Sequence, residues 1–368
     1  MRNKYRKNVR ECEKRPANLS TIRYENFSHR FAERMLPVLI SQKRTAAMKT
    51  VGLFCGGFSS EFEISMKSAQ TIVDHFPETF SIVKIEVTKA QWLAHASTGK
   101  VPFDMESFTF TDGTQTVKID IGLIYIHGDP GENGKIQAYL DMKGIPYVNS
   151  GALASELSFD KWYCNQFLNN FGIRVARSQF LTDRTTVDEA AVLSDLGLPC
   201  FVKPSDSGSS FGISRVNKAE EFAAALDKAF AEGGTVVVES FLDGTEVTCG
   251  VYRRKSGLHA LPLTEIASEN EFFDYDAKYL GKSQEITPAR IPDETRDKVW
   301  AVAKKCYELL RLRSIARIDF ILVDGEPVVI EVNTTPGFSQ ASLVPQMLQE
   351  GGISIRDFWQ EIFEVELD

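Results

Sequence analysis

The segment 317–337 constrains the fold of this chain more than any other. It reads as two apolar strands joined by Asp324-Gly325, a dipeptide typical of tight hairpin turns. Asp319 lies on the first strand, and Glu331 and Asn333 lie two residues apart on the second, so the latter two point to one face. Carboxylate and amide oxygens suit Mg²⁺ or Mn²⁺ better than zinc or iron. A metal held beside the nearby arginine is what a site that handles ATP phosphates requires.

The register of this hairpin decides whether the three oxygen ligands can meet. If the strands closed through a strict two-residue turn, Asp319 would lie opposite Ile330 and face away from Glu331. A three-residue loop, Asp324-Gly325-Glu326, or a β-bulge would bring Asp319 opposite Glu331. We therefore predict such a loop or a bulge. The alternative is an ordinary exposed hairpin with acidic ends.

Charge is divided unevenly along the chain. Residues 1–47 hold 12 of the 42 Lys and Arg residues but 4 of the 50 Asp and Glu residues. This basic leader lacks the apolar core of a secretory signal, and its glutamates argue against an organellar transit peptide. A nucleic-acid-binding arm is an alternative. Met48-Lys-Thr-Val-Gly-Leu-Phe looks like a natural start, so we expect residues 1–47 to be disordered or to result from a wrongly assigned start.

Composition narrows the class of protein. Apolar content is ordinary for a soluble globular enzyme, and no run of about 18 apolar residues could span a membrane. None of the six cysteines forms a Cys-x-x-Cys pair. We therefore expect reduced thiols, no structural zinc, a cytoplasmic location, and no membrane or nucleic-acid partner.

Strands and helices alternate over residues 48–150. This pattern predicts an α/β domain with a parallel sheet whose loops gather at the carboxyl ends of the strands. The predicted strands are Val51–Cys55, Phe80–Val87, Ile119–Ile126 and one beginning at Pro146–Val148, and the predicted helices are Glu61–Phe76 and Lys135–Lys143.

Two α+β lobes are predicted after residue 150. The first, 151–245, has a helix capped by Ser158, and the second, 246–368, contains a long polar loop at 268–290 of the kind that forms lids. The predicted elements are Ser158–Phe171, Cys200–Pro204, Glu220–Phe230, Thr235–Ser240, Glu246–Arg253, His259–Ile266, Arg296–Leu310, Val344–Glu350 and Ile355–Phe363.

Three further segments could contribute to a nucleotide site. Lys203 ends a strand before the Ser/Gly-rich loop 205–212, whose backbone N–H groups could approach phosphates, although the loop lacks the Walker A pattern and could be a plain linker. Residues 239–242, followed by Glu246, could bind adenosine or form an ordinary core strand. His127 begins a Gly-rich loop after a strand and could be structural or catalytic.

Five motifs occur in order along residues 48–368. They are Gly56-Gly-Phe-Ser-Ser-Glu-Phe-Glu-Ile-Ser65, His127-Gly-Asp-Pro-Gly-Glu-Asn-Gly134, Val202-Lys-Pro-Ser-Asp-Ser-Gly-Ser-Ser-Phe-Gly212, Phe273-Asp-Tyr-Asp-Ala-Lys-Tyr279 and the hairpin continued to Leu343-Val-Pro345. Together they resemble the motifs of the D-alanine–D-alanine ligases, a family of ATP-grasp enzymes. The resemblance implies three lobes, with an N-terminal parallel-sheet domain and an ATP cleft between two α+β lobes.

The resemblance implies a reaction and a role for each matching residue. ATP phosphorylates one D-alanine, a second D-alanine attacks the acyl phosphate, and the dipeptide serves peptidoglycan synthesis, with a homodimer as the working form. Two Mg²⁺ or Mn²⁺ ions would be held by the hairpin ligands, and Arg317 with Gly337 N–H would form the oxyanion site. The other implied roles are ATP contacts for Lys161, Lys203, Glu239, Phe241, Leu242, Glu246 and Lys278, D-alanine contacts for Glu61, His127, Ser342 and Leu343, and lid closure by Ser209 and Tyr279 with Glu61.

Other functions stay open at the level of sequence. A D-Ala–D-Lac or D-Ala–D-Ser ligase would share these motifs, although Tyr279 argues against the D-lactate form. A nucleotide-binding regulator without catalytic activity is an alternative from another class. The intact ligand set and Arg317 argue against that alternative.

Overall fold

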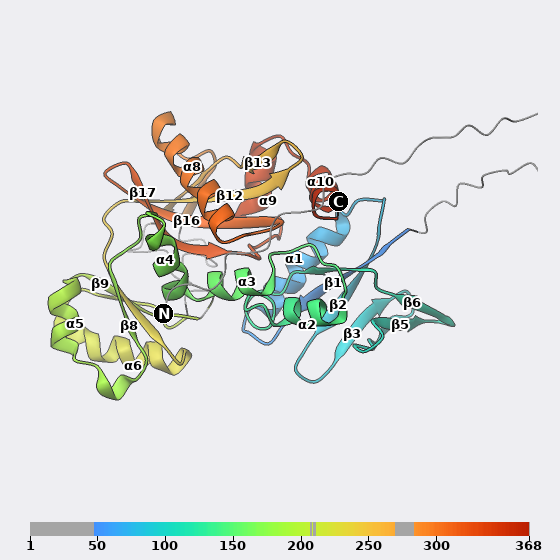
Figure 1. Cartoon of the computed structure of the whole chain (residues 1–368), viewed down its shortest axis with the longest axis horizontal. Coiled ribbons are helices and arrows are strands. Elements are labelled where there is room, and N and C mark those ends of the chain that lie inside the picture. The colour runs from blue at the N-terminus through green and yellow to red at the C-terminus, as the bar shows by residue number, and fades with distance from the viewer. Residues whose placement is uncertain (1–47, 207, 209–210, 269–282, 368) are drawn as a thin grey trace, which may run out of the picture. The chain divides into compact units, whose positions relative to one another are not determined.

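A five-stranded sheet organises the N-terminal part of the chain (Figure 1). The computed structural model describes residues 48–206, 208, 211–268 and 283–367. Strand β1 is buried along almost its whole length and pairs in parallel with β2 and β7, as expected for a strand covered on both faces. In the order β4-β3-β2-β1-β7, the strands are Gly99–Pro102, Trp92–Ala96, Ser81–Val87, Thr50–Gly56 and Ile121–Ile124.

The prediction of a parallel sheet is correct for β1, β2 and β7 and wrong for the rest. Strands β3 and β4 continue the sheet as antiparallel hairpins, and β5 (Thr109–Asp112) pairs with β6 (Gln115–Lys118) as a separate ribbon. The strand predicted at Pro146–Val148 is also wrong, because Tyr147 makes only an isolated bridge to Gly122. Helices α1 (Phe62–Asp74) and α2 (Lys135–Lys143) follow β1 and β7 as predicted.

The next lobe is a four-stranded antiparallel sheet in the order β10-β9-β11-β8. Helices α5 and α6 pack on it, and their apolar residues share one core with Val202 and Val238 (Figure 1). The strands are β8 (Ser178–Leu181), β9 (Cys200–Pro204), β10 (Ser214–Val216) and β11 (Val236–Ser240), and the helical segments are η1 (Arg184–Thr186), α5 (Glu189–Leu196), η2 (Ala219–Glu221) and α6 (Phe222–Glu232).

Two helices, not one, precede this lobe. Helix α3 (Ala152–Phe159) ends before Asp160, whose carboxylate accepts the Tyr163 N–H and caps α4 (Lys161–Asn170). The prediction that Ser158 caps a single helix is therefore wrong, since Ser158 lies inside α3. Asp160 also accepts the hydroxyl of Ser205 at 2.6 Å, a contact from a distant loop that fixes where the second helix begins.

The C-terminal sheet is antiparallel, and its central strands are β12 and β16. The single strand predicted at His259–Ile266 is wrong, because Pro262 lacks an N–H and separates β13 from β14. The strands are β12 (Thr245–Arg254), β13 (Gly257–Ala260), β14 (Thr264–Ser268), β15 (Ser283–Ile286), β16 (Ile315–Val323) and β17 (Glu326–Asn333), and the helices are α8 (Asp293–Leu309), α9 (Leu343–Glu350) and α10 (Ile355–Glu366).

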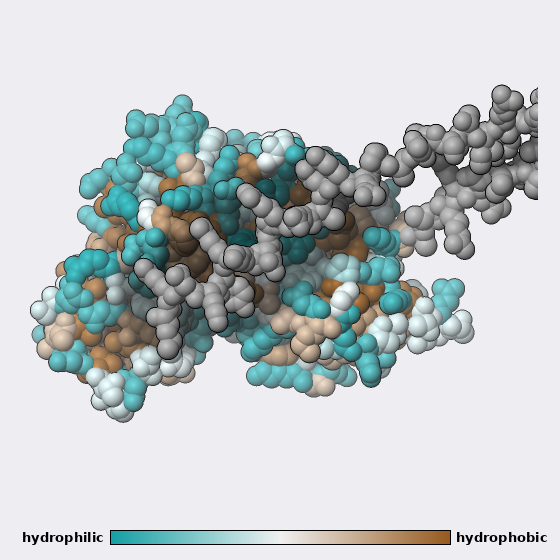
Figure 2. Space-filling model, viewed as in Figure 1, coloured by the Kyte–Doolittle hydropathy of each residue, from teal (hydrophilic) through white to brown (hydrophobic). Residues whose placement is uncertain are grey.

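Helix α8 illustrates how these helices cover the sheet. Val299, Ala303, Cys306 and Tyr307 are buried at helical spacing and join the core beneath β12 and β16. The opposite side of α8 contributes the hydrophilic surface at the upper left of Figure 2. No helix in the described part of the chain is long and apolar enough to cross a membrane.

One core joins the first and last parts of the described chain. Val51 and Leu53 of β1 share a buried apolar cluster with Phe338, which follows β17, and with Phe358 and Trp359 of α10. The loop after β17 is therefore packed against the N-terminal sheet. This packing positions the site.

Candidate active site

The β16–β17 hairpin brings the predicted metal ligands onto one face. A tight Asp324-Gly325 turn closes the hairpin, with positive φ at both residues, and the register then shifts between Asp319 and Phe320. Ile330 is the extra residue of this bulge, so Asp319 pairs with Glu331. The prediction of an odd loop or a bulge is confirmed in its second form.

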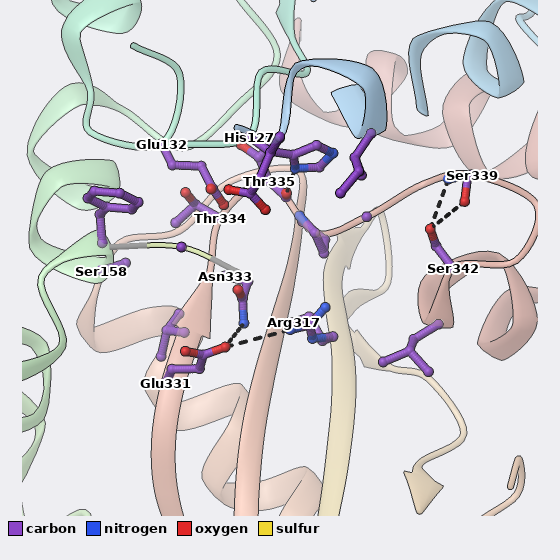
Figure 3. Close-up of a pocket in the computed structure, with 18 of the residues that line it drawn as sticks. His127, Glu132, Ser158, Arg317, Glu331, Asn333, Thr334, Thr335, Ser339 and Ser342 are labelled. Carbon is purple, nitrogen blue, oxygen red and sulfur yellow. Dashed lines mark hydrogen bonds and ion pairs between the residues drawn. The ribbon is translucent and has the colours of Figure 1, made fainter. Parts of the chain in front are cut away.

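Arg317 pairs with both acids of this hairpin, and Figure 3 shows its contact with Glu331. Its Nε and Nη2 donate to the two carboxylate oxygens of Asp319 at 2.8 and 2.7 Å, and Nη2 lies 3.8 Å from Glu331 Oε1. Asn333 Nδ2 donates to Asp319 Oδ2 at 3.1 Å. Burial opposes the charge of Arg317, but the Asp319 and Glu331 carboxylates outweigh it and hold the pKa of Arg317 above its usual value. The guanidinium is therefore a fixed cation.

The donors of the hairpin fit a hard divalent cation. No group of three His, Cys, Asp or Glu side chains suited to a metal occurs among the described residues, and this site offers two carboxylates and one amide instead. Mg²⁺ is commonly held by one or two carboxylates together with phosphate oxygens and water. Rotation of the Asn333 amide would turn its oxygen toward a bound cation. Thr248 Oγ1 donates to Asp319 Oδ1 at 2.5 Å and holds that carboxylate in place.

Two loops at the carboxyl ends of β1 and β7 supply further polar groups. Glu61 ends the loop before α1 and approaches Gly208 so closely that a Cβ there would lie 2.5 Å from Glu61 Oε2. His127 is buried, with Nδ1 2.9 Å from Thr335 O and Nε2 3.2 Å from Ser68 Oγ. Glycine at 208 thus allows the lobe formed by residues 151–245 to contact the N-terminal domain through the Glu61 carboxylate.

Glu132 belongs to the loop that begins with His127, and its side chain lines the same cavity as His127 and Glu61 (Figure 3). Its Oε2 accepts the N–H of Gly128 at 2.7 Å. Burial, reinforced by the Glu61 and Glu331 carboxylates, raises the pKa of Glu132 to about 8. A carboxyl group whose pKa is raised toward neutral pH by burial and neighbouring acids is typical of functional clefts.

The predicted adenosine residues line the other side of the cleft. Lys203 Nζ lies 2.7 Å from Glu239 Oε2, and both side chains are buried. The other carboxylate oxygen of Glu239 is buried and has no hydrogen-bond partner within the described residues. Phe241 stacks on Phe201 with ring centroids 6.3 Å apart, and the Arg215 guanidinium lies over the Phe241 ring at 4.7 Å.

The N-terminus of α9 also borders the cleft. Ser342 precedes this helix, and Leu343 is its first residue. Ser342 Oγ accepts the Ser339 N–H at 3.0 Å and lies 2.8 Å from Ser339 Oγ (Figure 3). Free N–H groups and the positive end of a helix favour a carboxylate at such a position.

These groups surround two adjoining cavities of about 470 and 510 Å³. The first is lined by the groups predicted for D-alanine, and the second by those predicted for adenosine. Lys161, Ile213, Arg317, Glu331 and Leu343 line both. The first also contains Glu61, His127, Asn333, Gly337 and Ser342, and the second contains Lys203, Glu239, Phe241, Leu242, Glu246 and Asp319.

Three predicted site residues, Ser209, Lys278 and Tyr279, lie outside the described residues. The sequence analysis also missed four polar residues. Lys67 and Glu132 line the cleft, while Ser68 and Thr248 bind His127 and Asp319. Helical spacing from Glu61 could have indicated Ser68, seven residues later on the same helix face.

Comparisons with known families cover most of the described chain. The model described as "D-ala D-ala ligase N-terminus" matches residues 50–150, and the model described as "D-ala D-ala ligase C-terminus" matches residues 167–364. The D-alanine–D-alanine ligase of Phocaeicola vulgatus is 41% identical over 319 residues, which cover 86% of this chain and 98% of that protein.

Solved structures of similar proteins share the fold. D-alanyl-alanine synthetase A from Vibrio cholerae has 30% identity and a TM-score of 0.78, over 87% of this chain and 99% of that one. The VanG D-Ala:D-Ser ligase from Enterococcus faecalis has 29% identity and a TM-score of 0.76 over the same shares. The Bacillus anthracis D-alanine–D-alanine ligase complexed with ATP has 27% identity and a TM-score of 0.70, over 87% and 97%.

Proposed function

The chain belongs to the D-alanine–D-alanine ligase family, and we propose that its cleft joins two D-alanines into D-alanyl-D-alanine for cell-wall synthesis, with ATP as the energy source. The observation that carries this proposal is the pair of adjoining cavities. Lys161, Arg317 and Glu331 line both, so a nucleotide in one would present its terminal phosphate to a substrate in the other.

Phosphoryl transfer comes first in the proposed reaction. A carboxylate is a poor acyl donor, so a carboxylate oxygen of the first D-alanine takes the γ-phosphoryl group of ATP, giving an acyl phosphate and ADP. This step needs positioning and charge neutralisation more than a covalent nucleophile. Asp319, Glu331 and Asn333 would hold two Mg²⁺ or Mn²⁺ ions, which neutralise phosphate charge when bound.

Dipeptide formation is the second step. The amine of the second D-alanine attacks the acyl carbon, and the carbonyl oxygen becomes negatively charged until inorganic phosphate leaves. Arg317 is a buried cation, and Gly337 lines the same cavity, so the guanidinium and this N–H are the proposed donors to the oxyanion. One such donor is typically worth about 3–4 kcal/mol.

ATP is held by residues of α4, of the sheet that contains β9 and β11, and of the C-terminal sheet. Lys161 and Lys203 contact its phosphates, while Glu239, Phe241, Leu242 and Glu246 bind the adenosine. The support for this assignment is the cavity that these side chains share with Asp319. Lys278, outside the described residues, is proposed to reach the γ-phosphate from the lid.

The two D-alanines occupy the other cavity. The Glu61 carboxylate pairs with the ammonium group of the first, near His127, and Ser342 with Leu343 receives the carboxylate of the second. The support is their common cavity and the helix N-terminus at Leu343. Ser209 and Tyr279 are proposed to link to Glu61 when the lid closes.

The working form proposed is a cytoplasmic homodimer. The five cysteines within the described residues are free and buried, as is common in a reducing compartment. Light scattering of the purified protein measures the oligomeric state. A monomer at the concentrations that support activity would contradict the dimer.

Product analysis tests the function. The purified protein is incubated with ATP and Mg²⁺ and with D-alanine alone or together with D-serine or D-lactate, and the products are identified by mass spectrometry alongside phosphate release. We expect D-alanyl-D-alanine to predominate and EDTA to abolish it. Because the VanG D-Ala:D-Ser ligase is similar in structure, the D-serine arm is essential. Predominant D-Ala–D-Ser or D-Ala–D-Lac would replace the proposal, and no phosphate release would refute it.

A further inference from the structure

Side chains from the N-terminal part of the chain hold the loop that follows β17. This loop, residues 334–339, is named here the reaction loop. His127 Nδ1 lies 2.9 Å from Thr335 O, and Tyr125 OH donates to Pro336 O at 3.1 Å. The N–H of Phe338 donates to Ser68 Oγ at 3.1 Å. Three of its backbone groups are thus fixed around Gly337, which itself lines the cleft.

The protons in this arrangement can be assigned from chemistry. Thr335 O can only accept, so His127 Nδ1 carries a proton. The Phe338 N–H can only donate, so Ser68 Oγ accepts it. The remaining contact joins Ser68 Oγ to His127 Nε2 at 3.2 Å. In a neutral imidazole with Nδ1 protonated, Nε2 is an acceptor, so the Ser68 hydroxyl donates to it.

The surroundings of the ring favour that neutral form. Desolvation lowers the pKa of His127, although the Glu61 carboxylate opposes the shift. Ser68, Tyr125 and His127 are all buried, so water does not compete for these bonds. Both ring nitrogens are engaged within the protein, which makes His127 a support for the reaction loop more than a proton donor to substrate.

We propose that Ser68 is a positioning residue for the ligase reaction. By donating to His127 and accepting from Phe338 N–H, it fixes both ends of the segment 335–338 and aims the Gly337 N–H at the carbonyl oxygen of the substrate. This role rests on the proposed function, in which that oxygen becomes an oxyanion. Ser68 itself does not touch the substrate.

The chain offers a matched control one turn earlier on α1. Ser65 is as fully buried as Ser68. Its hydroxyl donates to Tyr125 O at 2.6 Å and accepts the Gly56 N–H at 2.8 Å. Ser65 therefore makes the same kinds of bond on the same helix, but it forms no hydrogen bond with residues 334–339, and it binds Tyr125 only at the backbone oxygen and not at the hydroxyl that holds Pro336. A general loss of a buried serine would affect both variants alike.

The experiment compares Ser68→Ala with Ser65→Ala in the full-length protein. We expect Ser68→Ala to lower kcat about tenfold, because a small displacement of a catalytic donor is costly, and to leave the KM for ATP within about twofold. Ser65→Ala should keep kcat within about twofold of the wild type, even if its melting temperature falls as much as that of Ser68→Ala. His127→Asn should lower kcat, and adding Ser68→Ala to it should cause a smaller further loss than Ser68→Ala causes in the wild type, since the His127 bond is already gone and only the Phe338 N–H bond remains to be removed.

A second measurement tests the arrangement without relying on activity. The ¹⁵N resonances of the His127 ring should show a protonated Nδ1 and an unprotonated Nε2, and Ser68→Ala should shift the Nε2 resonance alone. Equal kcat values for the two serine variants, an effect confined to KM, or a proton on Nε2 would each overturn the proposal. An inactive wild-type protein would instead count against the proposed function, and the ring resonances would still report on the contact.

Discussion

Replacing Arg317 by alanine tests the centre of the cleft. The side chain makes a two-point contact with Asp319, and the side chains of both residues are largely buried, with 16% and 9% exposed. Removing one partner of a buried ion pair typically costs about 3–5 kcal/mol, because the other charge is left without compensation. Thr248 and Asn333 would still donate to Asp319, but neither supplies positive charge. We therefore expect a stability loss near the lower end of that range.

The catalytic effect of the same change should be separable from its effect on stability. Loss of one oxyanion donor corresponds to about 10²–10³ in turnover. ATP binding should stay largely intact, because the residues proposed to contact adenosine come from β11, β12 and the segment between them, whereas Arg317 belongs to β16. Steady-state phosphate release gives kcat, and calorimetric titration gives the ATP affinity. Arg254→Ala is the control, since it breaks the Arg254–Glu361 pair, 2.9 Å long, away from both cavities.

A cation in the cleft should partly replace the missing guanidinium. In Arg317→Ala, Mg²⁺ with ADP should raise the melting temperature more than in the wild type, because the bound ion restores positive charge beside Asp319. Near-normal turnover in Arg317→Ala would refute the oxyanion role. Normal turnover with weakened ATP affinity would show that Arg317 acts in nucleotide binding instead. An identical response to Mg²⁺ and ADP in both proteins would refute the metal assignment.

Three further changes test other parts of the cleft. Glu132→Gln removes a carboxyl group whose pKa is raised to about 8 in the folded protein. The stability that the wild type draws from protonation of Glu132 is fully present below about pH 4.5 and is lost as pH rises through about 8. The free energy of unfolding of the variant in urea should therefore rise relative to that of the wild type over this range, and a difference that does not change with pH would contradict this. Lys203→Met should weaken ATP binding and should also destabilise the fold, because Glu239 is left buried without its cation. Adding Glu239→Gln should recover stability, and additive losses of stability in the double variant would show that the pair is not coupled. Gly337→Ala places a Cβ 3.0 Å from Ser342 Oγ and should raise the KM for the second D-alanine by about tenfold, and unchanged kinetics would remove Ser342 from that subsite.

Sequence periodicity predicted the elements whose burial is set locally. Strands β1, β9 and β11 read as short apolar runs, and α8 shows helical spacing of its buried residues. Strands β4 and β6 were missed because most of their residues are exposed and carry no alternating pattern. The division between α3 and α4 was missed for another reason: the Ser205 hydroxyl, 45 positions away in the sequence, contacts Asp160.

The candidate site was predictable where chemistry and spacing coincide within one segment. Arg317, Asp319, Glu331 and Asn333 lie within 17 residues of sequence, and the need for a bulge followed from the alternation of side chains along a strand. Glu132 and Ser68 carry no such local signal. Their importance arises from groups brought in by the fold, namely the Glu61 carboxylate beside Glu132 and the Phe338 N–H beside Ser68.

The contacts of the reaction loop suggest why the N-terminal domain is needed for more than binding the first D-alanine. Phe338 packs in a core with Val51 and Leu53 of β1, while its N–H is held by Ser68 of α1. The loop carrying Gly337 is continuous with β17, which holds Glu331 and Asn333. A change in the N-terminal sheet that loosens this core would therefore disturb the proposed oxyanion donor Gly337, whose backbone is only four residues from Asn333, the nearest proposed metal ligand. Mutations in that core should lower turnover before they lower ATP affinity, because the adenosine contacts belong to other strands.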